Sequence, residues 1–175
     1  MTSPWLRSWR ADPEARKIAD RHYNRQHVGA TQFVPPGQCL VLLTDDRSAL
    51  WVTSWPFAEY VHHAWPGAWV CSAFRNEGKY LSSALIRHAV AHTIAEWPEI
   101  PELGMVTFVD QRKVKPKAHP GYCYLKAGFH HVGYTKGGLV ALQLLPEEMP
   151  QVEEVKEKST LSNFLTARKC LRQCS

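Results

Sequence analysis

The sequence predicts a mixed α/β domain in which strands and helices alternate irregularly. Three observations predict it: short apolar runs bounded by polar turns, helical stripes with apolar residues three and four positions apart, and two tight turns flanked by apolar runs. The chain has 175 residues, of which 45% are hydrophobic and 21% charged, so one compact domain with a full core is expected. This composition excludes a disordered chain, a coiled coil and a collagen-like rod.

The first helix and the first hairpin have clear boundary signals. Asp12-Pro13-Glu14 combines a capping Asp, a Pro at the first helical position and an acid in the first turn, so a helix is expected from there to about Arg25, stopping near Gly29. The apolar runs 38–44 and 49–55 flank a polar turn. They predict an antiparallel hairpin.

The middle of the chain predicts strand, helix and strand. Residues 69–74 and 105–109 are apolar strand-like runs. Between them, apolar residues and histidines recur at helical spacing over 81–95, and the helix is expected to end at Trp97-Pro98. Residues 122–128 fit a short helix closed by glycine.

A second hairpin is expected from 129–134 and 139–145, which flank Lys136-Gly137-Gly138. The order helix, hairpin, strand, helix, strand, helix, hairpin predicts mixed strands with crossover helices, without the strict alternation of a doubly wound sheet. We place the domain at 1–150 and a charged tail at 151–175. Apolar residues at helical spacing give the tail a possible terminal helix, whose docking the sequence leaves open: Leu161, Phe164, Leu165 and Leu171.

No stretch approaches the ~18 uninterrupted apolar residues of a membrane span, and the N-terminal residues lack the apolar core of a secretory signal. We therefore expect a cytoplasmic protein without membrane contact. The five cysteines are odd in number and lack a repeated close-pair spacing, which argues against a disulfide framework. Cys39 and Cys71 lie in apolar runs and are interpreted as core residues.

The formal net charge of +5 and the pI near 9.0 favour an anionic partner, nucleic acid or a phosphorylated cofactor. The alternative is that the charge carries no functional meaning. The excess positive charge is concentrated in the first 25 residues and in 103–144. The second segment contains six Lys or Arg residues and a single acid, Asp110.

The segment 74–80, between a strand and a helix, is the clearest candidate for chemistry. A glycine-bearing turn at a helix N-terminus offers unpaired backbone N–H groups to an anion. Arg75 and Lys79 add positive charge around Gly78, so these three residues are predicted to bind an anionic cofactor. The alternative is an ordinary loop before a helix.

This order of elements resembles the GNAT N-acetyltransferase fold over residues 11–145. The resemblance is carried by the R-x-x-G-x turn after a strand and by the segment Tyr124-Leu125-Lys126-Ala127-Gly128-Phe129 after the last helix. It implies a GNAT-like mixed, mostly antiparallel sheet with flanking helices. It also implies acetyl-CoA, whose pyrophosphate the family's turn cradles. Tyr80 stands where the family has Gly or Ala, which argues against that cofactor.

A narrower pattern is similar to Mom-type proteins, bacteriophage GNAT-fold enzymes that convert adenine in DNA to an N6-carbamoylmethyl derivative and so block restriction. It consists of His22-Tyr23, Arg75 before the central helix and Asp110 at the end of the next strand. The resemblance implies a reaction at His22, Tyr23 and Asp110. It further implies an iron cofactor, double-stranded DNA as the partner and the host-cell cytoplasm as the compartment.

For each of Asp110, His22 and Tyr23, the local sequence is compatible with the catalytic role and also with a structural one. Asp110 follows a strand directly, and a carboxylate at a sheet end can orient an amine or accept its proton; it can equally cap the loop by pairing with Arg112 or Lys113. His22 lies on the apolar stripe of its helix and fits a hydrogen-bonded core histidine equally well. Tyr23 fits a half-buried packing role.

Residues 106–134 mix cations with aromatic side chains, a combination suited to a phosphate track and an unstacked base. We expect Arg112, Lys113 and Lys115 to contact DNA phosphates and Tyr122 to stack on an extruded adenine. The alternative is that the aromatic residues fill the short helix and the hairpin.

No metal ligands are named from the sequence. His88 and His92 are four apart on one predicted helix face, which suits a metal, but the face is apolar, so packing is favoured. No Cys and His cluster has zinc spacing, and ligands for iron would come from distant segments.

Three functions are weighed. The first is a GNAT-like transferase that attaches an acyl or carbamoylmethyl group to adenine N6 in DNA. The second is an acetyl-CoA-dependent N-acetyltransferase of a small amine, and the third is a non-catalytic nucleic-acid-binding module. Asp110→Asn separates them, because either enzyme should lose most of its rate and a binding module should not. The sequence leaves a homodimer open.

Overall fold

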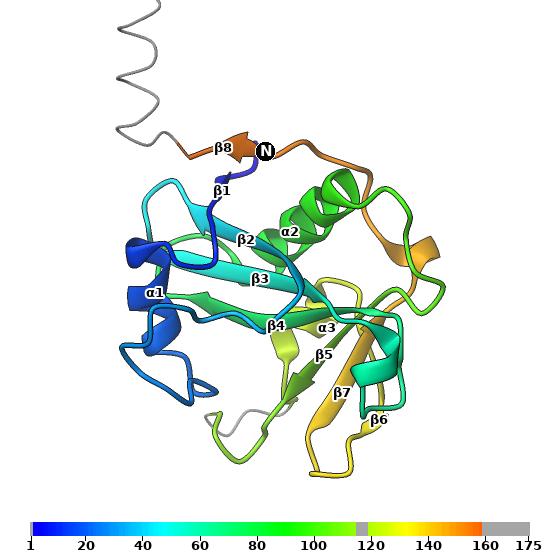
Figure 1. Ribbon diagram of the computed structural model, residues 1–175. Coiled ribbons are helices and arrows are strands. Elements are labelled where there is room, and N and C mark those ends of the chain that lie inside the picture. The colour runs from blue at the N-terminus through cyan, green and yellow to red at the C-terminus, as the bar shows by residue number, and fades with distance from the viewer. Residues whose placement is uncertain (1, 115–118, 159–175) are drawn as a thin grey trace, which may run out of the picture.

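The computed structural model describes residues 2–114 and 119–158. These residues form one eight-stranded sheet with the strand order β6-β7-β5-β4-β3-β2-β1-β8 and helices on both faces (Figure 1). The strands are β1 (Trp5–Arg7), β2 (Gln38–Thr44), β3 (Ala49–Trp55), β4 (Trp69–Asn76), β5 (Met105–Val109), β6 (His130–Tyr134), β7 (Val140–Leu144) and β8 (Lys156–Glu157). The α-helices are α1 (Pro13–Asp20), α2 (Ser82–Glu96) and α3 (Tyr122–Lys126). The predicted mixed, mostly antiparallel sheet is confirmed.

Most neighbouring strands pair antiparallel, and the central pair β4 and β5 is parallel. Their pairing covers only Trp69–Cys71 against Met105–Thr107. Because β4 continues to Asn76 while β5 ends at Val109, the two strands part beyond Cys71. A β-bulge lies at the same level along β4, because the register of β4 against β3 shifts at Ser72, the residue after Cys71. The sheet is therefore open at its centre.

Two cores follow from the alternation of side chains along the strands. In β2, Leu40 and Leu42 face the core covered by α2 and α3, whereas Val41 and Leu43 face the core beneath α1. All four are at most 2% exposed. The larger core also holds the buried Cys71, as predicted, and burial raises the pKa of its thiol to about 12.

The first helix begins as predicted, with the Asp12 side chain accepting the Glu14 N–H at 3.0 Å. It ends at Asp20 and not at about Arg25, so that boundary was wrong. The physical reason is the Asp20 carboxylate, which accepts hydrogen bonds from the Arg25 side chain at 2.8 Å and from the Gly29 N–H at 3.2 Å. These bonds stabilise a loop after Asp20 in place of further helical turns.

Both predicted hairpins, the β5 strand and the helices α2 and α3 are confirmed within a few residues. Strand β1 was not predicted. It is only three residues long and is defined by its partners, because Leu6 pairs with Leu43 on one side and with Lys156 on the other. The indole of Trp5 donates to the Leu85 carbonyl at 2.8 Å, which ties β1 to α2.

The described part of the C-terminal segment packs on the domain. The Nδ1 atom of His92 is 2.6 Å from the Glu153 carbonyl oxygen, and the Glu153 carboxylate is 2.7 Å from His88. Lys158 is 2.8 Å from the Asp12 carboxylate. His88 and His92 are thus packing residues, as favoured. The predicted terminal helix lies outside the described residues. Among the described helices, none combines the length and apolar character needed to cross a membrane.

Candidate functional site

A cleft of about 1000 Å³ lies where β4 and β5 part. One wall is the end of β4 with the first turn of α2, and the other is the end of β5 with the start of α3. His22 and Tyr23, which follow α1, complete the lining. Its volume is in the range of pockets that enclose a small molecule or a single nucleotide.

The cleft is positively charged. Four cationic side chains line it, and no carboxylate is among the described lining residues: Arg75, Lys79, Lys113 and Lys126. Arg75 is partly neutralised from behind, because its Nε lies 2.6 Å from Glu77, which also binds Arg21 at 2.5 Å. These two guanidinium groups lower the pKa of Glu77 to about 2, so the carboxylate stays ionised. The cleft therefore favours an anionic ligand.

The predicted turn contributes its cations to the cleft but not its glycine. Gly78 does not line the cleft, and its N–H donates to the Asn76 side chain at 3.0 Å. The N–H of Glu77 donates to the Ser48 carbonyl at 2.8 Å. Two backbone donors expected to hold an anion are thus already used, because this turn packs against the β2–β3 hairpin.

The N–H groups of Glu77 and Gly78 are not available to the cleft, but the first turn of α2 faces it. Leu81, at the cap position, provides no side-chain acceptor for the first N–H groups, and Ser82 and Ser83 line the cleft. The positive end of a 15-residue helix thus adds to the cations.

Tyr80 is directed toward the hairpin. Its hydroxyl donates to Asp45 at 2.7 Å, which raises the pKa of Tyr80 to about 12. The Lys79 ammonium lies 5.5 Å from the centre of the same ring. Tyr80, which stands where the acetyltransferase family has Gly or Ala, is therefore held by the hairpin and lines the cleft.

His22 is half-buried and stays neutral. Burial and the neighbouring Arg75 lower its pKa to about 4. Its Nδ1 accepts the Asn24 N–H at 3.2 Å. Because Nδ1 is the acceptor, the ring proton is on Nε2. His22 is therefore a weak proton acceptor in this arrangement.

Tyr23 stacks on His22, with ring centres 4.6 Å apart and planes at 23°. Burial raises the pKa of Tyr23, although the backbone N–H of Asp110 and the side chain of Asn24 lie near its hydroxyl and act to lower its pKa. The phenol therefore keeps its proton and can donate it to a ligand. The structure thus brings together Tyr23 and the backbone of Asp110, two segments far apart in the sequence.

The Asp110 carboxylate points elsewhere. It is 6% exposed and is held by Arg112, with Nε–Oδ1 at 2.9 Å and Nη2–Oδ2 at 3.1 Å. The Arg112 backbone N–H also donates to Oδ1 at 3.1 Å. The side-chain bond to Arg112 lowers the pKa of Asp110, and Asp110 does not line the cleft. Its geometry is that of the loop-capping alternative.

The predicted DNA-contacting residues divide into three groups. Lys113 and Tyr122 line the cleft, and Tyr122 is 50% exposed with the Lys126 ammonium 5.5 Å from its ring centre. Arg112 is exposed but does not line the cleft and is bound to Asp110. Lys115 lies outside the described residues.

Several lining residues had no predicted role at the site, among them Tyr124, Lys126 and His119. Tyr124 is buried, with its hydroxyl 3.5 Å from the Cys71 sulfur where the strands part. Lys126 and His119 lie on the α3 side. The segment 124–129 was singled out for its likeness to an acetyltransferase motif, and that signal could have placed Tyr124 and Lys126 at the site; His119 had no such signal.

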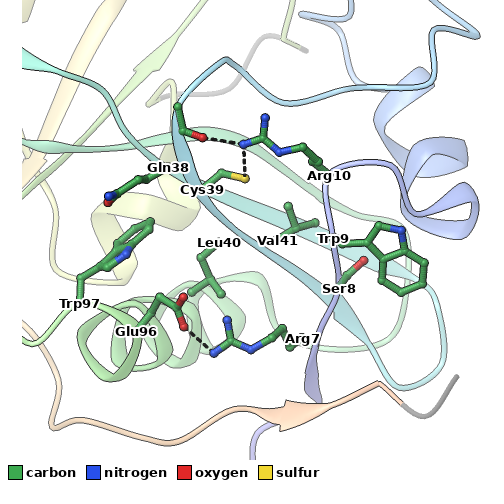
Figure 2. A pocket seen from close by; sticks show the side chains of 11 residues that line it. Arg7, Ser8, Trp9, Arg10, Gln38, Cys39, Leu40, Val41, Glu96 and Trp97 are labelled. Atoms are coloured by element: carbon green, nitrogen blue, oxygen red, sulfur yellow. Dashed lines mark hydrogen bonds and ion pairs between the residues drawn. The ribbon is translucent and has the colours of Figure 1, made fainter. Parts of the chain in front are cut away.

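A second hollow, of about 350 Å³, lies between the β1–α1 loop, the start of β2 and the end of α2 (Figure 2). The cations at its rim already have partners. Arg7 pairs with Glu96 at 2.5 Å, and Arg10 donates to the Gly37 carbonyl at 2.5 Å and to the Cys39 sulfur at 3.2 Å. It therefore offers less unpartnered charge than the cleft.

Among the residues that the structure describes, no group of three or more His, Cys, Asp or Glu side chains could hold a metal ion. The described residues therefore do not fit the iron that the resemblance implies. The cationic wall and the α2 terminus do fit the diphosphate of a coenzyme A-type cofactor. Comparison with known proteins gave no match to a family model, to a curated protein or to a solved structure.

Proposed function

We propose that this protein is a GNAT-like transferase that attaches a small acyl or carbamoylmethyl group to a nucleobase amine, adenine N6, in double-stranded DNA. The observation that carries the proposal is the cleft between the parting strands, with four cations and no carboxylate among its described lining residues. A nucleic acid and a phosphorylated group donor are both anionic, so one cationic cleft suits both.

The strand arrangement supports the GNAT-like part of the proposal. Parallel β4 and β5 sit at the centre of an otherwise largely antiparallel sheet and part at the level of a bulge. Helix α2 follows β4 and begins at the opening. The acetyltransferase resemblance implies such a site, with the donor bound at the start of the central helix.

The two walls of the cleft suit two different ligands. Arg75, Lys79 and the first turn of α2 hold the anionic carrier of the transferred group. Lys113 and Lys126 contact the DNA phosphates on the other wall, and the exposed Tyr122 ring stacks on the extruded base. The reacting carbon and amine then meet near Tyr23, between the walls.

Tyr23 and Asp110 act together in this proposal. With the Asp110 backbone N–H beside its oxygen, the Tyr23 hydroxyl directs its own proton toward the bound ligands, where it stabilises developing negative charge on an oxygen of the donor. Asp110 is a positioning residue, because its carboxylate fixes the turn through Arg112. His22 supports the Tyr23 ring by stacking.

The test is mass spectrometry of nucleosides from the DNA of cells that express the full chain. We expect a modified deoxyadenosine with the wild type, and its loss with the variant Arg75→Gln/Lys79→Gln. Lys136→Gln removes an exposed cation of the β6–β7 turn outside the cleft and should leave the level unchanged. Unmodified DNA from cells that contain folded wild-type protein would overturn the proposal.

The second function, acetyl-CoA-dependent acetylation of a small amine, is favoured by one observation: the α2 terminus opens into the cleft beside Arg75 and Lys79. It predicts saturable acetyl-CoA binding that weakens in Arg75→Ala, with unmodified DNA. A non-catalytic DNA-binding module predicts DNA retention without either result. Titration calorimetry with acetyl-CoA and filter binding with duplex DNA separate the two.

A further inference from the structure

We infer that His119 is the general base of the proposed transfer and accepts the proton of the attacking amine. The inference rests on the proposed function and assigns a role to a residue that neither the sequence patterns nor the resemblance selects. His119 is exposed and lines the cleft beside the start of α3. Among the described residues, no hydrogen bond or ion pair engages its ring.

Attachment of a group to an amine needs a proton acceptor. As the amine nitrogen bonds to the electrophilic carbon of the activated donor, the bond between that carbon and the leaving group breaks, and the leaving group departs with the electron pair. The amine N–H proton passes to an imidazole nitrogen of His119. The exposed imidazolium then releases the proton to solvent, which restores the base for the next turnover.

The two other candidate bases are occupied. Nδ1 of His22 already accepts the Asn24 N–H at 3.2 Å, and burial beside Arg75 lowers the pKa of His22 to about 4, which makes it a weak base. Both oxygens of Asp110 are held by Arg112, and the carboxylate lies outside the cleft. Each would have to break existing hydrogen bonds before it could take a proton.

Other side chains that line the cleft are cations or phenols, which are poor proton acceptors. The cations are Arg75, Lys79, Lys113 and Lys126. Burial raises the pKa of both Tyr23 and Tyr124, so these two phenols keep their protons. Imidazole is the side chain that most readily exchanges a proton near neutral pH, and within residues 2–114 and 119–158 no group bonds to the ring nitrogens of His119.

The chain after His119 is held in place. Gly121 has φ of +74° at the cap of α3, and a Cβ there would lie 2.5 Å from Leu142 Cδ1. This close approach anchors the turn that carries His119 and Tyr122 against β7. The predicted stacking residue Tyr122 and the proposed general base His119 are thus three positions apart on one anchored turn, and both line the cleft.

The test compares His119→Gln with His62→Gln, which changes an exposed histidine outside the cleft. Nucleoside mass spectrometry of DNA from expressing cells should show a loss of modification of roughly 10²-fold or more for His119→Gln and no change for His62→Gln. Melting temperature and duplex-DNA affinity should be unchanged in both variants, since His119 is exposed and has no hydrogen-bond or ion-pair partner in the described part of the chain.

A second variant reports on proton transfer itself. In permeabilised cells, free imidazole should restore part of the modification by His119→Gly and none of that by Arg75→Gln/Lys79→Gln. Modification by His119→Gln at the wild-type level would overturn the inference and leave the proposed function standing. Absence of modification with the folded wild type would overturn the proposed function and this inference with it.

Discussion

Gly78 lies against Ser48 so closely that a Cβ on the glycine would be 2.0 Å from the Ser48 hydroxyl oxygen and 2.5 Å from its Cβ. The contact joins the turn after β4 to the β2–β3 hairpin. Close packing against Ser48 therefore requires a glycine at position 78. Gly78 itself does not line the cleft, but Arg75 and Lys79 on either side of it do.

Gly78→Ala should lower the free energy of unfolding by about 1–3 kcal/mol, because the added methyl meets a Cβ that cannot rotate away. Urea denaturation measures the change. Ser48→Gly removes the obstructing side chain, so the double variant should be more stable than the sum of the single changes predicts. Simple additivity would contradict the contact.

Glu77→Gln should reduce the pH dependence of stability at acid pH. The pKa of Glu77 is lowered from 4.5 to about 2 by Arg21 and Arg75, so its contribution is fully present above about pH 4.5 and is lost as pH falls through about 2. Urea unfolding between pH 5 and 2 checks this. Glu59→Gln, at an exposed position, should leave the slope as in the wild type.

The same Glu77→Gln change should strengthen binding of the anionic group donor. It leaves the Arg75 guanidinium without its 2.6 Å carboxylate partner and frees it for the phosphates of the donor's carrier, which the proposed function places on this wall of the cleft. Titration calorimetry with coenzyme A measures the affinity of the variant against the wild type. An unchanged affinity would show that Arg75 does not face the donor.

His22 should titrate far below an ordinary histidine. Burial and Arg75 lower its pKa to about 4, so the stability it supports above about pH 6.5 is lost as pH falls through about 4. Long-range ¹H–¹⁵N NMR spectra should show an unprotonated Nδ1 at pH 7. The exposed His62 in the same spectra serves as the reference, and a shared midpoint would refute the assignment.

Lys158→Ala should destabilise the protein by about 3 kcal/mol, because it leaves the buried Asp12 without its cationic partner at 2.8 Å. Thermal and urea unfolding measure the loss. Lys156→Ala, on the exposed strand β8, is the matched control and should change stability little. Equal effects would mean that the ion pair does not anchor the C-terminal segment.

The elements that local sequence predicts best are those whose signals lie within the element. The capping Asp12, the run 38–44 with its turn, and the stripe that ends at Trp97-Pro98 specify backbone conformation through nearby atoms alone. Strand β1 is three residues long and exists because β2 and β8 pair with it. A segment defined by distant partners leaves little periodic signal in its own residues.

The candidate site was predicted in part. His22, Tyr23, Arg75, Lys79, Lys113 and Tyr122 line one cleft. They were selected by three separate signals: the resemblance to Mom-type proteins, the cationic glycine turn, and the mix of cations and aromatic residues in 106–134. The side-chain partners of Asp110 and Gly78 were not settled by sequence. Arg112, two positions away, holds the carboxylate, and Ser48, from a distant hairpin, packs on the glycine.

By itself, the sequence determined the mixed α/β class, the position of most elements and the positive charge near the site, because these follow from periodicity, capping and composition. Tertiary structure alone decided where the sheet opens, which cations share the cleft and which titratable groups remain free. Those properties depend on hydrogen bonds and contacts between segments far apart in the chain, such as that of Tyr23 with the Asp110 backbone, which no local pattern encodes.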